Sequence, residues 1–460
     1  MLIGTGLRQL KIGVSGVRGV VGEAMTPELV VDFACAFGTY CGGGPVVVGR
    51  DTRASSSMFH AAVLSALISA GADVLDLGVC PTPVVAHTVR RVGAPGGISI
   101  TGSHNDARWN ALKFIGPEGA LLNAANSEEL LDIYHASAFE LASWQDLGKV
   151  RAAEDPFGDY LKTLYEAVDA EAIRRRGFRI AVDFCNGAAI EPARRFLERL
   201  GCRVVALNDD ADGVFAHPPA PSPANMRQLA ALLRSIEADL GAAINVDGDR
   251  LGLVLGTGEA LSEECVLPLI GRYVIPRRPG PVVTNLSTSR MIEHVAQEYG
   301  RQCIRTNVGE GFVMDRALTE DAALAGEGNG GVAVLPHTAT FDALLSLATV
   351  LEAMAVRNCS LEELTAGLPR LYMRKAELPC APADVYRVLD GFRQRYAEAS
   401  PDLTDGVRFE WPDAWLHVRA SNTEPLLRVI AEADSEERLE SLFEETLALA
   451  RRAVWTPGGR

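Results

Sequence analysis

The feature that most constrains the fold is a pattern of strand, helix, glycine and strand that the sequence repeats. In its first copy, an apolar segment at 45–51 precedes a helix-like segment at 57–70, and Gly71 leads into a second apolar segment at 72–77. Glycine directly after a helix favours a left-handed cap, and a crossover of this length connects parallel strands. The pattern therefore predicts a βαβ unit.

Two further copies of this pattern occupy residues 178–207 and 281–304, with Gly201 and Gly300 at the ends of their helices. Successive copies begin more than a hundred residues apart. Solenoid proteins repeat on a much shorter period, so this spacing predicts three similar domains.

The C-terminal part of the chain follows a different pattern. A helix-like segment at 383–389 precedes short apolar segments near 407–411 and 415–418. A longer apolar segment at 426–432 then leads to a final helix at 436–452. This order is typical of a small antiparallel α+β domain.

We therefore predict an α/β protein with three similar βαβ-containing domains, mixed sheets and a C-terminal α+β domain. The expected domains are 1–150, 151–256, 257–368 and 369–460. Their number agrees with a prior of about 150 residues per domain. Because the sequence contains no low-complexity linker, we expect the domains to pack around a central cleft.

Composition excludes several classes of protein. The net charge of −15 argues against a nucleic-acid or anionic-membrane partner, so an anionic substrate would need local arginines. Nine cysteines without a C-x-x-C pair or close histidine clusters indicate reduced thiols and no structural zinc. No apolar run approaches the roughly 18 residues of a membrane span, and residues 1–13 lack a cleavable apolar core. We expect a cytoplasmic protein and leave its oligomeric state open.

A candidate covalent site is the loop 101–105 (TGSHN), which follows the apolar segment 96–100. Open α/β sheets bind ligands at the carboxyl ends of their strands. Ser103, with His104 beside it and Lys113 ten residues on, could carry a covalent group if its hydroxyl were activated. The alternative is a turn whose side chains hydrogen-bond their own backbone.

A candidate metal loop follows the apolar segment 242–244. Asn245, Asp247 and Asp249 place oxygen-bearing side chains at alternate positions, which suits Mg²⁺. An EF-hand is excluded because Arg250 stands where that loop needs glycine. An Asx-type turn is the alternative, but Arg250 is the only neighbouring cation partner for the two aspartates, so metal binding is favoured.

The glycine-rich segment 326–331 (GEGNGG) is a candidate sugar-binding loop. Glycines let the backbone approach a ligand, and Glu327 and Asn329 offer acceptors for sugar hydroxyls. The segment is not G-x-G-x-x-G, so a nicotinamide site is not expected. A plain glycine-rich hairpin is the alternative.

A candidate phosphate loop lies near the C-terminus. Its two guanidinium groups, two hydroxyls and one amide suit a phosphate dianion, and they belong to Arg419, Ser421, Asn422, Thr423 and Arg428. A solvated turn is the alternative.

Arg18 adds a basic residue to a loop in the first expected domain. Arg18 and Lys113 could neutralise a transferring phosphoryl group or handle a hydroxyl proton. Each could equally be a member of a surface ion pair.

Taken together and in this order, these loops resemble the α-D-phosphohexomutase family, which includes phosphoglucomutase, phosphomannomutase and phosphoglucosamine mutase. The resemblance covers nearly the whole chain, from residues 15–19 to Arg428. It implies the catalytic residues Ser103, Arg18, His104, Lys113 and Arg250. It implies that Mg²⁺ is held by Ser103, Asn245, Asp247 and Asp249. The implied substrate-binding residues are Glu327, Asn329, Arg419, Ser421, Asn422, Thr423 and Arg428.

The resemblance implies a small-molecule phosphosugar substrate, with hexose 1- and 6-phosphates of the glucose or mannose type interconverted. The route would pass through a phosphoserine and a hexose 1,6-bisphosphate. The GEGNGG form favours the alternative of a phosphoglucosamine mutase. A further alternative is a non-catalytic phosphosugar-binding pseudoenzyme, because Asn245 replaces the family's usual aspartate and should weaken cation affinity.

Overall fold

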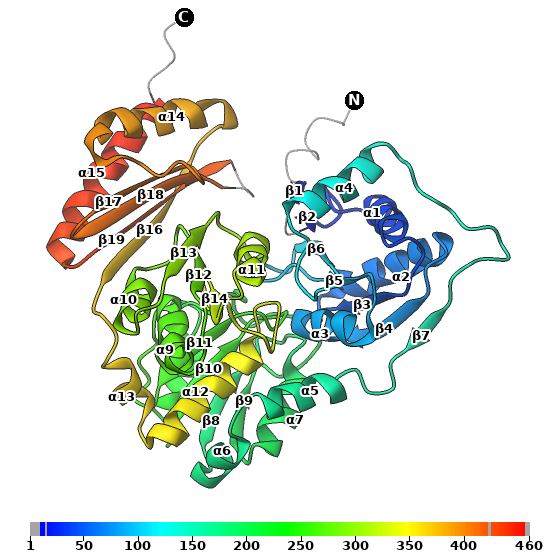
Figure 1. Cartoon of the computed structure of the whole chain (residues 1–460), viewed down its shortest axis with the longest axis horizontal. Helices are drawn as coiled ribbons and strands as arrows, with labels where there is room; N and C mark the ends of the chain where they lie inside the picture. Colours follow the sequence, from blue (N-terminus) through cyan, green and yellow to red (C-terminus); the bar gives the residue numbers. More distant parts are fainter. Residues whose placement is uncertain (1–9, 14–15, 422–424, 456–460) are drawn as a thin grey trace, which may run out of the picture.

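The computed structural model describes residues 10–13, 16–421 and 425–455. These residues form four sheets, each covered by helices, and the blue first unit and the orange-red fourth unit flank the second and third (Figure 1). The predicted architecture of three βαβ-containing units and an α+β unit is confirmed. None of the described helices has the length and apolar character needed to cross a lipid bilayer.

The first unit is built on a seven-stranded mixed sheet of order β1-β2-β6-β5-β3-β4-β7. Its elements are β1 (Lys11–Gly13), β2 (Gly16–Val20), α1 (Pro27–Tyr40), β3 (Val46–Arg50), α2 (Ala54–Ser69), β4 (Val74–Val79), α3 (Thr82–Val92), β5 (Gly96–Ile100), β6 (Trp109–Ile115), α4 (Ala124–His135) and β7 (Val150–Ala152). Strand β5 is buried along its whole length, and it leads directly into the loop of Ser103.

The second unit has a four-stranded sheet of order β11-β10-β8-β9. Its elements are α5 (Gly158–Glu166), α6 (Ala170–Arg176), β8 (Arg179–Asp183), α7 (Ile190–Arg199), β9 (Arg203–Leu207), α8 (Arg227–Leu233), β10 (Leu240–Ile244) and β11 (Leu251–Leu255). Strands β10 and β11 are antiparallel, and the predicted metal loop joins them.

The third unit has a four-stranded sheet of order β13-β12-β14-β15. Its elements are η2 (Glu263–Cys265), α9 (Val266–Val274), η3 (Ile275–Arg277), β12 (Val282–Asn285), α10 (Met291–Glu298), β13 (Cys303–Thr306), α11 (Glu310–Thr319), β14 (Leu324–Gly326), β15 (Val332–Val334), α12 (Ala343–Arg357) and α13 (Leu361–Thr365).

The fourth unit has an antiparallel sheet of order β16-β19-β18-β17. Its elements are β16 (Tyr372–Pro379), α14 (Pro382–Arg395), η4 (Ala397–Ala399), β17 (Val407–Trp411), β18 (Ala414–Ala420), β19 (Leu426–Ala433) and α15 (Glu436–Trp455). The sequence did not predict β16, which begins this unit.

The three predicted repeats all form parallel strand pairs, β3 with β4, β8 with β9 and β12 with β13. The glycine after each connecting helix is left-handed, with φ of 77° at Gly71, 75° at Gly201 and 63° at Gly300. These glycines end each helix where a residue with a Cβ would be strained.

The described residues form five clusters of buried apolar side chains, and two of these clusters show how the units are joined. One cluster of buried side chains runs from Val47 in β3 through Phe196 in α7 to Met354 in α12, so the first three units share it. The fourth unit has its own cluster, which includes Phe392 and Phe409. Apolar packing therefore joins the first three units, whereas polar contacts such as the Arg290–Asp434 ion pair help to hold the fourth.

Candidate active site

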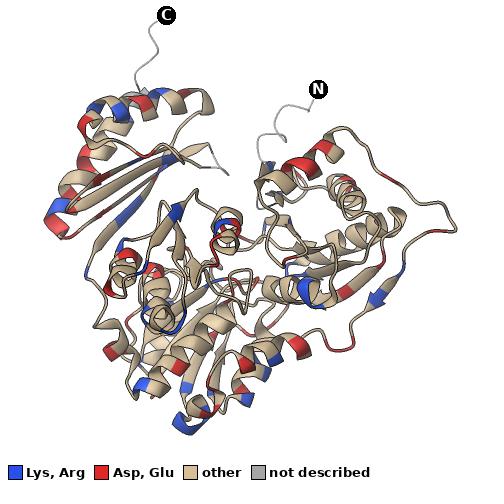
Figure 2. Cartoon of the chain, viewed as in Figure 1, with Lys and Arg blue, Asp and Glu red and all other residues tan. Residues whose placement is uncertain are grey.

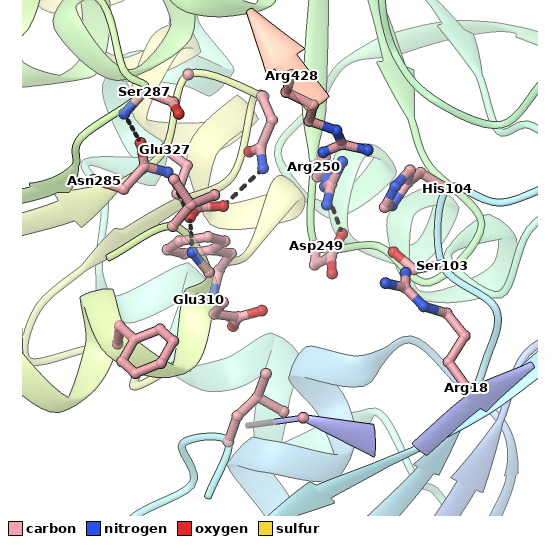
Figure 3. A pocket seen from close by; sticks show the side chains of 18 of the residues that line it. Arg18, Ser103, His104, Asp249, Arg250, Asn285, Ser287, Glu310, Glu327 and Arg428 are labelled. Carbon is pink, nitrogen blue, oxygen red and sulfur yellow. Dashed lines mark hydrogen bonds and ion pairs between the residues drawn. The ribbon is translucent and has the colours of Figure 1, made fainter. Parts of the chain in front are cut away.

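A cavity of about 750 Å³ is lined by residues from all four units (Figure 3). Figure 3 shows Arg18, Ser103 and His104 across the pocket from Glu327. Ten residues predicted from the sequence line this pocket, namely Arg18, Ser103, His104, Lys113, Asp249, Arg250, Glu327, Asn329, Arg419 and Arg428. The tertiary structure thus brings four motifs from separate parts of the chain to one pocket.

Ser103 lies in the loop that follows β5. Its backbone is left-handed, with a φ of 49°, and its N–H donates to Thr101 Oγ1 at 2.9 Å. The side chain is buried, and its hydroxyl has no hydrogen-bond partner among the described residues. A buried polar atom without a partner is rare and calls for an explanation, and a bound group in the pocket would supply one.

The residues beside Ser103 differ in their electrostatic surroundings. The Arg250 guanidinium and burial lower the pKa of His104 well below its usual value, so this imidazole is neutral. Arg18 Nη1 donates to Asn105 Oδ1 at 3.0 Å, which connects β2 to the serine loop. A fixed positive charge therefore stands near Ser103.

The two aspartates of the predicted metal loop are almost completely buried and share a cation. Lys113 Nζ lies 2.7 Å from Asp247 Oδ2 and 2.8 Å from Asp249 Oδ2. Burial alone would lower the pKa of Lys113, but the two carboxylates raise it above its usual value. The expectation that Arg250 is their only cation partner was wrong, because strand β6 brings Lys113 between them.

The side-chain amide of Asn245 donates hydrogen bonds to both aspartates of the loop. Its Nδ2 lies 2.9 Å from Asp247 Oδ1 and 2.6 Å from Asp249 Oδ1, and its Oδ1 accepts the Arg250 N–H at 3.0 Å. This arrangement occupies the side-chain oxygen that a metal ligand would have to offer. The role of Asn245 as a ligand stays a prediction.

The donor set nevertheless suits a hard cation. Two convergent carboxylates, from Asp247 and Asp249, and the hydroxyl of Ser103, which no described residue engages, are oxygen donors of the kind Mg²⁺ prefers. The Lys113 ammonium now neutralises the carboxylates in the way that such a cation would.

The glycine-rich loop is both a hairpin and part of the pocket. It joins the antiparallel strands β14 and β15, and Glu327 and Asn329 line the cavity. Glu327 accepts hydrogen bonds from Asn285 Nδ2 at 2.6 Å, the Gly309 N–H at 2.8 Å and Asn329 Nδ2 at 2.8 Å. The loop can therefore be a glycine-rich hairpin and still contribute side chains to a sugar-binding pocket.

The predicted phosphate loop is only partly described. Arg419 Nε donates to both oxygens of Asp405 at 3.0 Å, while its buried Nη2 has no partner among the described residues. Arg428 lies on β19, and its Nε is 3.4 Å from Glu377 Oε1. Ser421 is described but does not line the cavity, whereas 422–423 lie outside the described residues, so the predictions for Asn422 and Thr423 stay predictions.

The sequence analysis missed several polar residues of the pocket. Lys375 on β16 lies 2.8 Å from buried Glu264, and both line the cavity. Glu310, the first residue of α11, accepts a hydrogen bond from the Phe341 N–H at 3.0 Å, and burial raises its pKa to about 7. The glycine-containing segment after β13 could have indicated Glu310, since it follows the carboxyl end of a strand.

A second polar cluster lies outside this cavity, in the second unit. Possible ligand atoms of Asp183, Cys185 and His217 lie within 4.8 Å of one another, although the sequence showed no close histidine cluster. His217 Nε2 lies 2.8 Å from Asp183, whose hydrogen bond raises the histidine pKa. Burial raises the pKa of Cys185, so its thiol stays protonated and the cluster is a hydrogen-bonded histidine and aspartate beside a thiol.

Four domain families match consecutive parts of the chain. The first three are described as phosphoglucomutase/phosphomannomutase, alpha/beta/alpha domains I, II and III, and they match residues 9–141, 158–258 and 263–372. The fourth, the phosphoglucomutase/phosphomannomutase C-terminal domain, matches residues 384–449.

Whole proteins and solved structures agree with this match. A probable phosphoglucosamine mutase of Methanopyrus kandleri is 35% identical, over 96% of this chain and 98% of that protein. A phosphoglucomutase/phosphomannomutase of Thermococcus kodakarensis is 32% identical with the same coverage. A phosphoglucomutase/phosphomannomutase family protein of Burkholderia thailandensis superposes with a TM-score of 0.84 at 27% identity, over 99% of both chains.

The chain belongs to the phosphoglucomutase/phosphomannomutase family of α-D-phosphohexomutases. It is an isomerase of the intramolecular phosphotransferase type, which interconverts hexose 1- and 6-phosphates.

Proposed function

We propose that Ser103 carries the phosphate that the enzyme transfers. Phospho-Ser103 donates its phosphoryl group to the free 1- or 6-hydroxyl of the bound sugar, and a hexose 1,6-bisphosphate forms. This intermediate turns around in the pocket and returns its other phosphate to Ser103. The observation that carries the proposal is the Ser103 hydroxyl, which is buried, unpartnered among the described residues and at the wall of the cavity.

The charges around the pocket support this role. A phosphoserine carries close to two negative charges and must meet an anionic sugar phosphate. Arg18 and Arg250 line the cavity on the side of Ser103, so they can offset charge during transfer (Figure 3). Arg419 and Arg428 come from the fourth unit, and we assign them to the phosphate that does not react.

We propose Mg²⁺ as the cofactor, held by Asp247, Asp249 and Ser103. When bound, the cation neutralises charge on the transferring phosphoryl group. Lys113 would then have to release one or both carboxylates. Asn245 stabilises the loop by donating to both aspartates, and it leaves the loop with one negative charge fewer than an aspartate would give.

The leading substrates are glucose and mannose phosphates, with glucosamine phosphates as the alternative. Both kinds of name occur among relatives of similar identity. The net charge of −15 and the interspersed acidic and basic residues in Figure 2 support a small-molecule partner, not nucleic acid or a membrane. We also propose a cytoplasmic location.

A substrate panel tests the proposal. Purified protein with Mg²⁺ and a trace of hexose 1,6-bisphosphate should interconvert the 1- and 6-phosphates of glucose, mannose or glucosamine. Failure with all three sugars would favour the phosphosugar-binding pseudoenzyme.

The carrier residue has a test of its own. Intact-mass measurement should show one additional phosphate on a fraction of the protein, and Ser103→Ala should lose it. A phosphate mapped by peptide analysis to another residue would overturn the assignment of Ser103.

A further inference from the structure

Arg53 makes an unusually complete set of contacts beneath the serine loop. It is 1% exposed and precedes α2. Its Nη2 donates to the carbonyl oxygens of Ser103 and Asn105, each at 2.7 Å. Its Nη1 donates to the carbonyl oxygens of Asp106 and Trp109.

The remaining donor of the Arg53 side chain is also used, since Nε lies 2.9 Å from Asp51 Oδ2. A guanidinium group has five N–H donors in a fixed fork. One bond at Nε and two at each terminal nitrogen account for all five. Arg53 therefore has no donor left for a phosphate, and it does not line the cavity.

The contacts of Arg53 act on the backbone that sets the direction of the Ser103 side chain. Ser103 has a φ of 49°, a left-handed conformation that costs a non-glycine residue free energy. Arg53 holds the carbonyl of Ser103 itself and that of Asn105, two residues on. The preceding residue, Gly102, leaves room for the guanidinium, because a Cβ there would lie 2.8 Å from Arg53 Cζ.

A segment of the second unit covers Arg53 from the other side. The ring of Phe215 lies 4.8 Å from the guanidinium carbon. Gly213 packs so closely against the first unit that a Cβ would lie 2.6 Å from the Thr52 carbonyl oxygen. The hydrogen bond between His217 Nε2 and Asp183 Oδ2, at 2.8 Å, connects this segment to the end of β8.

We propose that Arg53 is a positioning residue for phosphoryl transfer. It holds the Ser103 loop in the conformation that aims the hydroxyl into the pocket, and Phe215 of the second unit holds Arg53 in place. This inference rests on the proposed role of Ser103 as the phosphate carrier. Lysine cannot replace arginine here, because an ammonium has three donors and no planar fork.

The test compares Arg53→Lys with Arg50→Lys. Arg50 ends β3, three residues before Arg53, but the hydrogen bond of its side chain goes to the Asp51 carbonyl, not to the serine loop. We expect Arg53→Lys to lower kcat about 100-fold, since a small misplacement of a reacting group has an effect of this size. KM should stay within about twofold, because the pocket arginines are unchanged, and Arg50→Lys should behave as the wild type.

A second readout separates positioning from general loss of structure. Protein phosphorylated on Ser103 is freed of sugar, and the rate at which it loses phosphate to water is followed by intact mass. We expect this rate to change in Arg53→Lys while binding of sugar phosphate to the same variant, measured by calorimetry, stays within about twofold. Phe215→Leu should lower kcat when it is the only substitution, and it should have little additional effect on kcat when Arg53→Lys is already present.

Three outcomes would overturn the proposal: equal kcat in Arg53→Lys and Arg50→Lys, a parallel loss of kcat and sugar-phosphate binding, or fully additive effects of Phe215→Leu and Arg53→Lys. Failure of the underlying function is distinguishable, because Ser103→Ala would then retain both activity and the bound phosphate.

Discussion

The ammonium group of Lys113 lies between two buried carboxylates, 2.7 Å from Asp247 and 2.8 Å from Asp249. Those contacts hold its proton, because the carboxylates raise its pKa above the usual value. Lys113 is therefore poorly suited to act as a base while this ion pair is intact. It is better described as a cation that neutralises the predicted metal loop.

We predict that Lys113→Met makes the loop depend on a divalent cation. Removing one partner of a buried ion pair leaves uncompensated charge and costs about 3–5 kcal/mol. The melting temperature should fall in the presence of a chelator and recover with Mg²⁺. Calorimetry should show tighter Mg²⁺ binding than in the wild type, and weaker binding would contradict competition between Lys113 and the metal.

We predict that Asn245→Asp also tightens Mg²⁺ binding. The substitution removes the Nδ2 donor to both aspartates and adds a third negative charge to the loop. Asn245→Ser, which removes the donor without adding charge, is the matched control and should bind Mg²⁺ more weakly than Asn245→Asp. Equal Mg²⁺ affinity for wild type and Asn245→Asp would show that charge at this position does not contribute.

At the scale of single elements, the repeated units follow from local signals. Gly300 ends the helix of the third repeat with a φ of 63°, and nothing lies within 4 Å of where its Cβ would be. A side chain at this position would therefore cause backbone strain without a steric clash. The same pattern after α2 and α7 explains why all three crossovers could be predicted.

We predict that Gly300→Ala destabilises the protein by about 1–2 kcal/mol, since alanine is strained in the left-handed conformation. The matched control is Gly391→Ala, because Gly391 lies inside α14 and also has open space around its Cβ position. That change should be neutral or stabilising by about 0.5–1 kcal/mol. Thermal unfolding measures both, and a lower melting temperature for Gly391→Ala than for Gly300→Ala would contradict the explanation.

Strand β16 shows where local signals fail. Residues 372–379 carry Arg374, Lys375 and Glu377, and exposed and partly buried positions are interspersed along the strand. Its edge position in the sheet explains this polar composition. An edge strand buries less apolar surface than a central one, so its sequence carries a weaker period. Pairing with β19, about fifty residues away, defines it instead.

At the scale of the whole molecule, a buried histidine links the third and fourth units. His417 on β18 is completely buried, and its Nδ1 lies 2.9 Å from Ser287 Oγ in the third unit. Its Nε2 donates to the Asp405 carbonyl at 2.6 Å, so Nδ1 accepts from the serine hydroxyl. Burial lowers the pKa of His417 to about 4.

We predict that this link makes stability depend on pH. Because the folded pKa is about 4 and the unfolded value is about 6.5, the unfolded chain binds more protons between these values. The contribution of His417 is therefore complete above about pH 6.5 and is lost as the pH falls towards about 4. His417→Gln should reduce the change in melting temperature between pH 7 and pH 4, measured by thermal unfolding.

The control for this prediction is His294→Gln. His294 is exposed on α10 and does not bridge the units, so its replacement should leave the pH profile unchanged. An identical profile for wild type and His417→Gln would show that other groups dominate acid destabilisation.

Ten residues of the candidate pocket could be predicted, and several of them follow strands at recognisable spacings. Ser103 follows β5, Asp249 follows β10 and Glu327 follows β14, so each has a local signal. Their partners could not be predicted. Lys113 and Asp247 are separated by 134 residues, and no periodicity connects them.

The sequence by itself determined the three repeated βαβ units and the loops at the ends of their strands, because apolar periodicity and glycine caps depend on neighbouring residues. Only the tertiary structure decided which charges neutralise one another and which polar atoms stay without a partner. Attraction between charges and the cost of burying them depend on distance and exposure in the folded chain. The five contacts of Arg53 exist only once the first unit has folded, and the ion pair of Lys113 exists only once the first and second units have packed together.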